Sequence, residues 1–130
     1  MQNLLTGNVG VERPLVVTNP LDNAINVTDT ATAEQITGGV ITSTSAAAVT
    51  ITTPTAAAIA AALGFIGGTF FDFVVDNSAG SNTITVSLDS SITALAVITG
   101  GNTLTIASGK VGIFRLYFKS TTAAFIARLA

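Results

Sequence analysis

The sequence predicts an all-β protein: an antiparallel, jelly-roll-like sandwich of about eight strands, with one short helix and an extended N-terminal arm. Two observations predict this class. Short segments rich in valine, isoleucine and threonine recur about every 8–12 residues, which is the spacing of sandwiches and barrels. The chain of 130 residues is also 48% hydrophobic and only 9% charged, which favours many half-buried strands. It shows no internal sequence repeat.

The first 33 residues have no sustained hydrophobic period and contain Pro14 and Pro20. A segment of this length without its own element is uncommon inside a compact domain. We therefore expect residues 1–33 to form an extended arm and residues 34–130 to form the β-sandwich domain. Fully stretched, the arm would reach about 110 Å, far beyond the body of one molecule.

From residue 34 onward, alternating or β-branched segments predict the strands, and glycine, asparagine and serine mark the turns between them. Between residues 111 and 119, for example, Gly112, Phe114, Leu116 and Phe118 share one face. Residues 77–81 are expected to form a hairpin loop. The expected strands span residues 36–44, 48–52, 69–76, 82–88, 92–99, 103–107, 111–119 and 123–129.

One helix is expected between the second and third strands. Thr53 is a suitable N-cap, Pro54 suits the first helical position, and an alanine-rich run continues to Leu63. Gly64 follows at the position where a left-handed residue commonly ends a helix.

Composition excludes several chemistries. The chain has no histidine and no cysteine, so it offers no imidazole base, thiolate nucleophile, disulfide or Cys/His zinc site. Asp72 and Asp76 would lie about 13 Å apart on one strand face, too far for a glycosidase pair. We therefore expect no enzymatic activity, no cofactor and no bound metal, although a structural calcium ion remains open.

Charge and hydropathy limit the partners. The net charge is −2 and the pI is about 4.6, which disfavours binding to nucleic acid phosphates. No apolar run is long enough to cross a membrane as a helix. Residues 1–109 carry seven acidic residues and one basic residue, whereas residues 110–130 carry four basic residues. The acidic body and the basic C-terminal hairpin are therefore expected either to attract each other or to present solvated strand faces.

Several motifs together carry a resemblance. They include the Thr-Pro-Thr-Ala-Ala-Ala-Ile-Ala-Ala-Ala-Leu helix, and they lie at residues 35–42, 46–63, 68–73, 77–86, 108–115 and 127–129. The arrangement resembles small β-sandwich modules of tailed-bacteriophage virion proteins, notably head decoration (cement) proteins and capsid fibres. The resemblance covers about residues 35–130.

The resemblance implies a structural virion protein on the outer surface of a capsid, a homotrimer that clamps adjacent major capsid subunits. Such proteins often make the contact through an N-terminal arm. The arm residues expected to contact the capsid or a neighbour are Leu4, Leu5, Val9, Val11, Arg13, Leu15 and Val17. Phe65, Phe70 and Phe125 are expected at a subunit interface.

Two other functions remain open. A fibre or receptor-binding module would recognise a ligand on a host surface and would need an exposed aromatic or metal-lined pocket. A small glycan hydrolase would need two carboxylates within catalytic reach, which the strand spacing disfavours.

Overall fold

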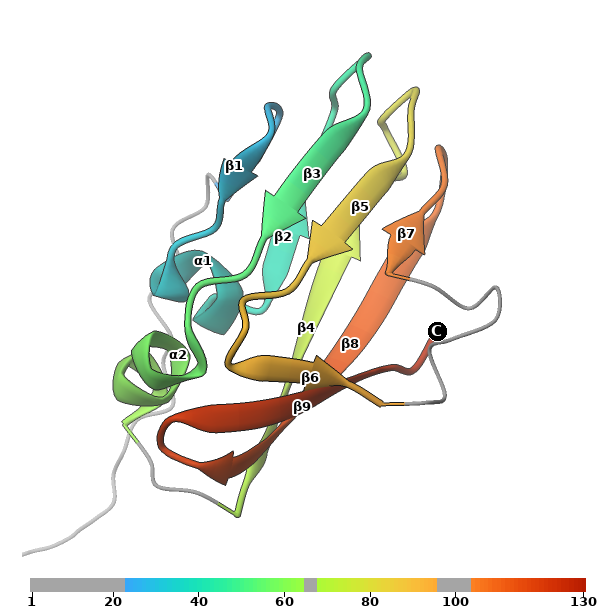
Figure 1. Cartoon of the computed structure of the whole chain (residues 1–130). Coiled ribbons are helices and arrows are strands. Elements are labelled where there is room, and N and C mark those ends of the chain that lie inside the picture. Colours follow the sequence, from blue (N-terminus) through green and yellow to red (C-terminus); the bar gives the residue numbers. More distant parts are fainter. Residues whose placement is uncertain (1–22, 65–67, 96–103) are drawn as a thin grey trace, which may run out of the picture.

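The computed structural model describes residues 23–64, 68–95 and 104–130, and these residues form a predominantly β structure (Figure 1). Two short helices accompany the strands. In chain order the elements are β1 (Asp29–Thr30), α1 (Ala33–Thr37), β2 (Val40–Thr42), β3 (Val49–Thr52), α2 (Ala56–Leu63), β4 (Phe70–Asp76), β5 (Ile84–Ser87), β6 (Ile92–Ala94), β7 (Thr105–Ile106), β8 (Val111–Ser120) and β9 (Ala123–Arg128).

The strands form two sheets, and both sheets are mixed. One has the order β1-β3-β5-β7 and the other has the order β2-β4-β8-β9-β6. Pairs β1–β3, β3–β5, β2–β4 and β6–β9 are parallel, whereas β5–β7, β4–β8 and β8–β9 are antiparallel. The prediction of an antiparallel sandwich was therefore wrong in its strand directions, although the β class is confirmed.

The parallel pairs arise because the chain coils. Ala24 bridges to β2, and the chain then runs through β1 in the four-stranded sheet and α1 before returning to β2. The next turn runs through β3 and α2 to β4, and the third through β5 and β6. In this way the other sheet and a helix supply the crossover that the parallel pairs β1–β3, β3–β5 and β2–β4 need, whereas β6 joins the far edge of the five-stranded sheet beside β9. This structural repeat has no counterpart in the sequence.

Helix α1 lies where a strand was expected from residue 36. Thr32 caps it: its hydroxyl accepts from the Gln35 N–H, and the Gln35 side chain accepts from the Thr32 N–H. This reciprocal capping box satisfies two backbone donors of a five-residue helix. Ile36, which was predicted to begin a strand, is buried in the core and instead anchors a helix.

Helix α2 was expected, but it begins two residues later. Thr55, rather than Thr53, is the N-cap, and its hydroxyl accepts from the Ala58 N–H at 3.1 Å. Thr53 is buried instead, and its hydroxyl accepts from the Asp89 N–H. Gly64 ends the helix in the left-handed conformation at φ 73°, as predicted.

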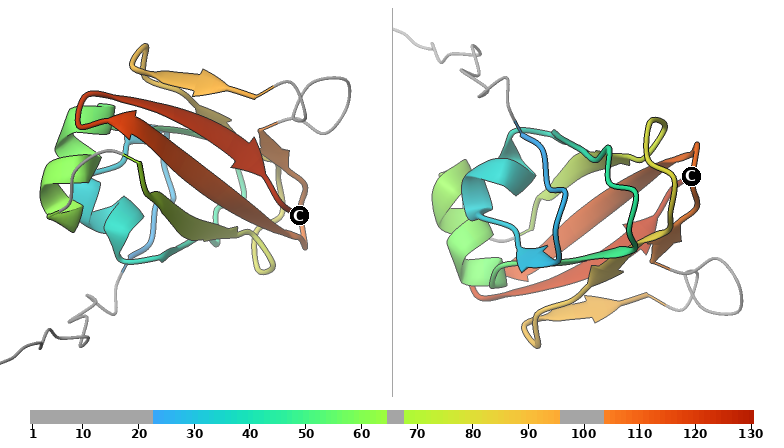
Figure 2. Two further views of the ribbon diagram at one scale, coloured as in Figure 1. Left: turned by 90° about the horizontal axis from the view of Figure 1, so that it is seen from below. Right: turned by 90° about the horizontal axis from the view of Figure 1, so that it is seen from above.

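The hydrophobic core lies between the two sheets, with α1 and α2 packed side by side at one end (Figures 1 and 2). The four predicted residues Gly112, Phe114, Leu116 and Phe118 of β8 all point inward and are buried. Phe73 of β4 stacks on Phe114 with ring centroids 5.4 Å apart. These contacts fix which face of the five-stranded sheet points outward.

The N-terminal boundary of the folded body lies before residue 34. Ile25 and Ala31, which fall within the predicted arm, are buried in the core. The Ala31 N–H donates to the Thr52 carbonyl, and the Ile25 N–H donates to the Thr42 carbonyl. Residues 23–33 thus begin the first turn of the coil.

The segment after β4 is not a hairpin, because β4 and β5 belong to different sheets. Asn77 organises this crossing. Its side chain is buried, and its amide donates to the carbonyls of Asn82, Ile106 and Ala107 at 2.7, 3.1 and 3.1 Å. One side chain thereby ties the end of β4 to the start of β5 and to β7.

Candidate interaction surface

The outward face of the five-stranded sheet carries three rows of side chains that run across the strands. The strand registers align these residues, with Leu129 joined to Ile113 by a backbone hydrogen bond. We call them the aromatic row (Phe70, Tyr117 and Phe125), the central row (Asp72, Arg115 and Ala127) and the aliphatic row (Val40, Val74, Ile113 and Leu129).

The aromatic row contains Phe70, the most exposed large hydrophobic side chain of this face. Phe70 is 57% exposed and Tyr117 is 36% exposed, and their ring centroids lie 6.3 Å apart. Tyr117 pairs with Phe125 of β9, over whose ring the Lys119 ammonium lies at 4.5 Å. Exposed aromatic side chains next to one another are typical anchors of protein contacts.

The central row carries a closed ion pair. The Arg115 guanidinium donates to both Asp72 carboxylate oxygens at 2.7 and 2.9 Å, and it lies over the Phe70 ring at 4.2 Å. These hydrogen bonds hold the pKa of Asp72 below its usual range and raise the pKa of Arg115. The pair joins the acidic body to the basic C-terminal hairpin and leaves the centre of the face electrically neutral.

The aliphatic row lies on the other side of this pair. Val40 and Leu129 are 41% and 47% exposed, whereas Val74 and Ile113 between them are half-buried. The row runs across β2, β4 and β8 to Leu129, which follows β9. A protein surface rarely presents aliphatic and aromatic rows on one sheet face unless something covers them.

The outward face of the four-stranded sheet is different in character, because hydroxyl groups replace the apolar rows. Thr50 pairs with Thr85, which pairs with Thr105, and Thr52 pairs with Ser87 in the next row. These side chains are half-buried. Uncharged hydroxyls thus keep this side of the molecule polar, so the apolar contact surface lies on the opposite sheet.

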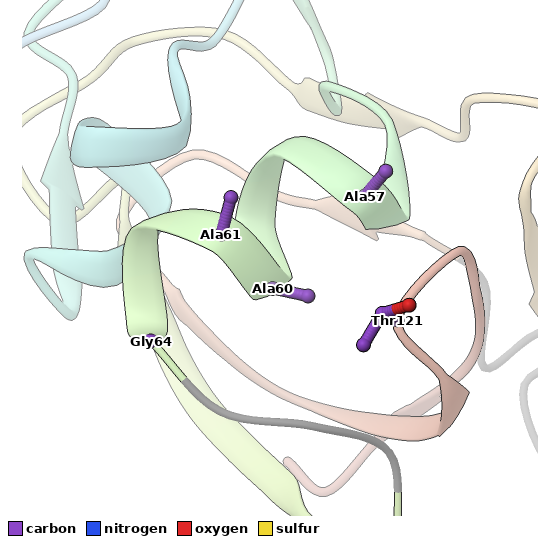
Figure 3. A pocket seen from close by; sticks show the side chains of 5 residues that line it. All are labelled: Ala57, Ala60, Ala61, Gly64 and Thr121. Atoms are coloured by element: carbon purple, nitrogen blue, oxygen red, sulfur yellow. The ribbon is translucent and has the colours of Figure 1, made fainter.

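Depressions also lie on the described surface. One, of about 270 Å³, lies between α2 and the β8–β9 turn and is lined by Ala57, Ala60, Ala61, Gly64 and Thr121 (Figure 3). Its only side-chain polar group is the Thr121 hydroxyl, so its lining supplies no acid, base or nucleophile for catalysis. The alanine side chains leave room there because none extends beyond Cβ.

Another depression, of about 300 Å³, is lined by residues 42–44 together with Asp76, Ser78 and Ala79. Asp76 is its only charged group, and hydrogen bonds from Ser78 hold the pKa of that carboxyl below its usual range. Among residues 23–64, 68–95 and 104–130, no three carboxylates come together as a metal site would require. The side-chain amides of Asn77 and Asn23 donate to backbone carbonyls.

Only some of the predicted contact residues lie in the described part of the chain. Phe70 and Phe125 lie on the outward face, in the aromatic row, and therefore stay candidates for a subunit interface. Phe65 lies outside the described residues. The predicted arm contacts also lie outside them; these are Leu4, Leu5, Val9, Val11, Arg13, Leu15 and Val17.

Sequence reasoning missed Tyr117 and the entire aliphatic row. The signal was present in β8, where Ile113 and Tyr117 alternate with the buried residues and so make both faces of one strand apolar. A strand with a solvated outer face would carry polar residues at these positions.

No protein-family model, curated protein or solved structure matches this chain. None of the helices in the described part of the chain has the length and apolar character needed to cross a membrane.

Proposed function

We propose that this protein is a structural virion protein that decorates and cements the exterior of a tailed-phage capsid, as a homotrimer bridging adjacent major capsid subunits. The observation that carries the proposal is the outward face of the five-stranded sheet, with its aromatic and aliphatic rows on either side of a closed ion pair. Such a face suits contact with protein, and the sequence resemblance supplies the capsid as the partner.

The physical role follows from mass action. A protein that binds only the expanded capsid lattice stabilises that lattice relative to every state it does not bind. Each contact that buries apolar surface contributes roughly 25 cal/mol per Å² of area removed from water. Many such contacts across the seams between capsid subunits would oppose the outward pressure of packaged DNA.

Deletion of residues 1–20 tests whether the arm makes the contact with the capsid. The deletion leaves Asn23 and Ile25, where the described fold begins, unchanged. We expect the shortened protein to fold, to keep the oligomeric state of the full chain, and to stop sedimenting with expanded capsids that lack the native protein. Equal capsid binding by the full and shortened proteins would refute contact through the arm.

One observation favours a second function, recognition of a host surface glycan by a fibre or receptor-binding module. Phe70 and Tyr117 present exposed rings beside Asp72 and Arg115, which offer hydrogen-bond acceptors and donors at the edge of an apolar platform. Ligand sites combine apolar contact with a few polar groups that fix orientation. Binding of the isolated protein to a glycan array, lost in Phe70→Ala, would favour this function over cementing.

A further inference from the structure

We infer that the aromatic row, together with Lys119 at its border, binds an acidic, extended segment of a partner protein. A partner carboxylate would contact the Lys119 ammonium, and a partner apolar side chain would lie on the rings. The inference rests on the proposed function, because it states the chemistry by which the capsid surface would be recognised. It can also be tested with short peptides and without a capsid.

The apolar half of this site is the aromatic row itself. The ring centroids of Phe70 and Tyr117 lie 6.3 Å apart, and Phe125 lies opposite Tyr117 on the neighbouring strand β9. Aromatic side chains have few rotatable bonds, so they lose little conformational entropy when a partner covers them. The three adjacent rings therefore form a prepared contact for an apolar side chain.

A β-bulge gives the row its charged border. The register between β8 and β9 shifts between Phe118 and Ser120, so Lys119 is the extra residue of β8. A bulge redirects a side chain at the point where it interrupts the ladder, and the Lys119 ammonium lies over the Phe125 ring at 4.5 Å. Lys119 is also exposed. The ammonium is thus held beside the rings and is open to a ligand.

The charge of this site selects an acidic partner. Asp72 already neutralises Arg115 through two hydrogen bonds. Within residues 23–64, 68–95 and 104–130, by contrast, no carboxylate forms a salt bridge with Lys119. The rings are therefore flanked by a neutral ion pair on one side and by one uncompensated positive charge on the other. Charge complementarity favours a carboxylate there and opposes a basic partner.

The strand geometry fixes how the side chains of the partner are spaced. Lys119 and Tyr117 lie two residues apart on β8, which separates them by about 7 Å. In an extended segment, side chains two residues apart point to the same side and have the same separation. An acidic residue two positions from an apolar residue therefore fits over Lys119 and Tyr117, whereas directly adjacent residues would point to opposite sides.

A protein segment fits this surface better than a sugar. The aromatic and aliphatic rows are about 14 Å apart across the neutral central row, so the apolar surface is wider than one sugar ring. Sites for small ligands are concave, whereas the two depressions described above are lined by residues outside the aromatic row. These observations favour a protein partner.

Titration of the full chain with three peptides, followed by two-dimensional NMR, tests the site. Each peptide is acetyl-Leu-Ser-X-Ser-Leu-amide, in which X is glutamate, glutamine or lysine, and its symmetry makes the result independent of chain direction. We expect the glutamate peptide to shift the amide signals of residues 117–125 and to bind about three- to five-fold more tightly than the glutamine peptide, as one exposed ion pair permits. Equal affinities for the three peptides, or no shift with any of them, would overturn the inference.

Two lysine variants provide the matched comparison. Lys119→Gln should bind the glutamate and glutamine peptides equally. Lys110→Gln removes the same charge just before β8, at the end away from the aromatic row, and should keep the native preference for glutamate. Phe70→Ala should weaken the binding of all three peptides without changing their ratio. If Lys119→Gln kept the native preference, the carboxylate would not contact Lys119 and the inference would be wrong.

Capsid binding separates this inference from the proposed function. Sedimentation with expanded capsids that lack the native protein should be weakened by Lys119→Gln and unchanged in Lys110→Gln. Native capsid binding by Lys119→Gln would overturn the inference and leave the proposed role of the arm intact. If the native protein bound the glutamate peptide but no capsid, the site would stand and the proposed function would fall. Binding of the acidic sugar sialyllactose without binding of the peptides would overturn the inference and favour the receptor-binding module.

Discussion

Replacement of Asn77 by alanine should destabilise the fold more than any other single polar change among the described residues. The Asn77 amide donates to the carbonyls of Asn82, Ile106 and Ala107, and the side chain is 1% exposed. The hydrogen bond to the Ile106 carbonyl is buried and the other two are partly buried, so water replaces the amide only in part. The variant therefore loses hydrogen bonds and leaves buried acceptors unsatisfied.

The magnitude follows from the number of bonds. The two amide hydrogens are shared among three carbonyls, and each protein hydrogen bond contributes about 1 kcal/mol net, with a further penalty for each buried unsatisfied group. We expect Asn77→Ala to lower the free energy of unfolding by about 3 kcal/mol. With a urea dependence of about 2 kcal/mol per M, the midpoint of unfolding should fall by about 1.5 M.

The assay is urea unfolding followed by circular dichroism at pH 7, with two further variants. Asn82→Ala is the matched control, because the exposed Asn82 amide makes a single bond, to the Ala46 carbonyl at 2.8 Å. Asn77→Asp keeps the size of the side chain but replaces the donor with a carboxylate, so it should cost at least as much as Asn77→Ala. If Asn77→Ala and Asn82→Ala shifted the midpoint equally, Asn77 would not join the two sheets as argued.

Three further predictions concern packing, capping and charge. Gly112→Ala should lower the free energy of unfolding by about 1–3 kcal/mol in thermal or urea unfolding, because its Cβ would lie 2.6 Å from a buried Ile106 carbon. Ser91→Ala should lower it by about 1–2 kcal/mol, because the Ser91 hydroxyl accepts from the first N–H of α2 at 2.8 Å; no change would mean that water replaces this cap. Asp72→Asn should be less stable than wild type near pH 7. The pKa of Asp72 is lowered in the folded state, so the stability that its carboxylate contributes is present above pH 3.8 and is lost as the pH falls through the folded-state pKa. A stability difference between wild type and Asp72→Asn that grew in acid would contradict this sign.

Some features of the interaction surface were predictable from the sequence. Phe70 and Phe125 were expected at an interface because they lie next to small residues or on weakly patterned faces, and the structure places both in the aromatic row. Attraction between the basic C-terminal hairpin and the acidic body was one of two alternatives expected from the charge distribution, and Arg115 binds Asp72. The row itself was not predictable, because alignment of β4, β8 and β9 depends on register between distant segments.

The sequence by itself determined the local elements. The alternation in β8 and the alanine run of α2 ending at Gly64 are properties of residues two to four apart, so their side chains reveal them directly. Only the tertiary structure decided that β3 and β5 run parallel and that residues 33–37 form a helix. Strand direction depends on which distant segment completes the hydrogen-bond ladder and covers the core. The alternation of side chains is the same in parallel and antiparallel strands, so the chain pattern could not distinguish the two.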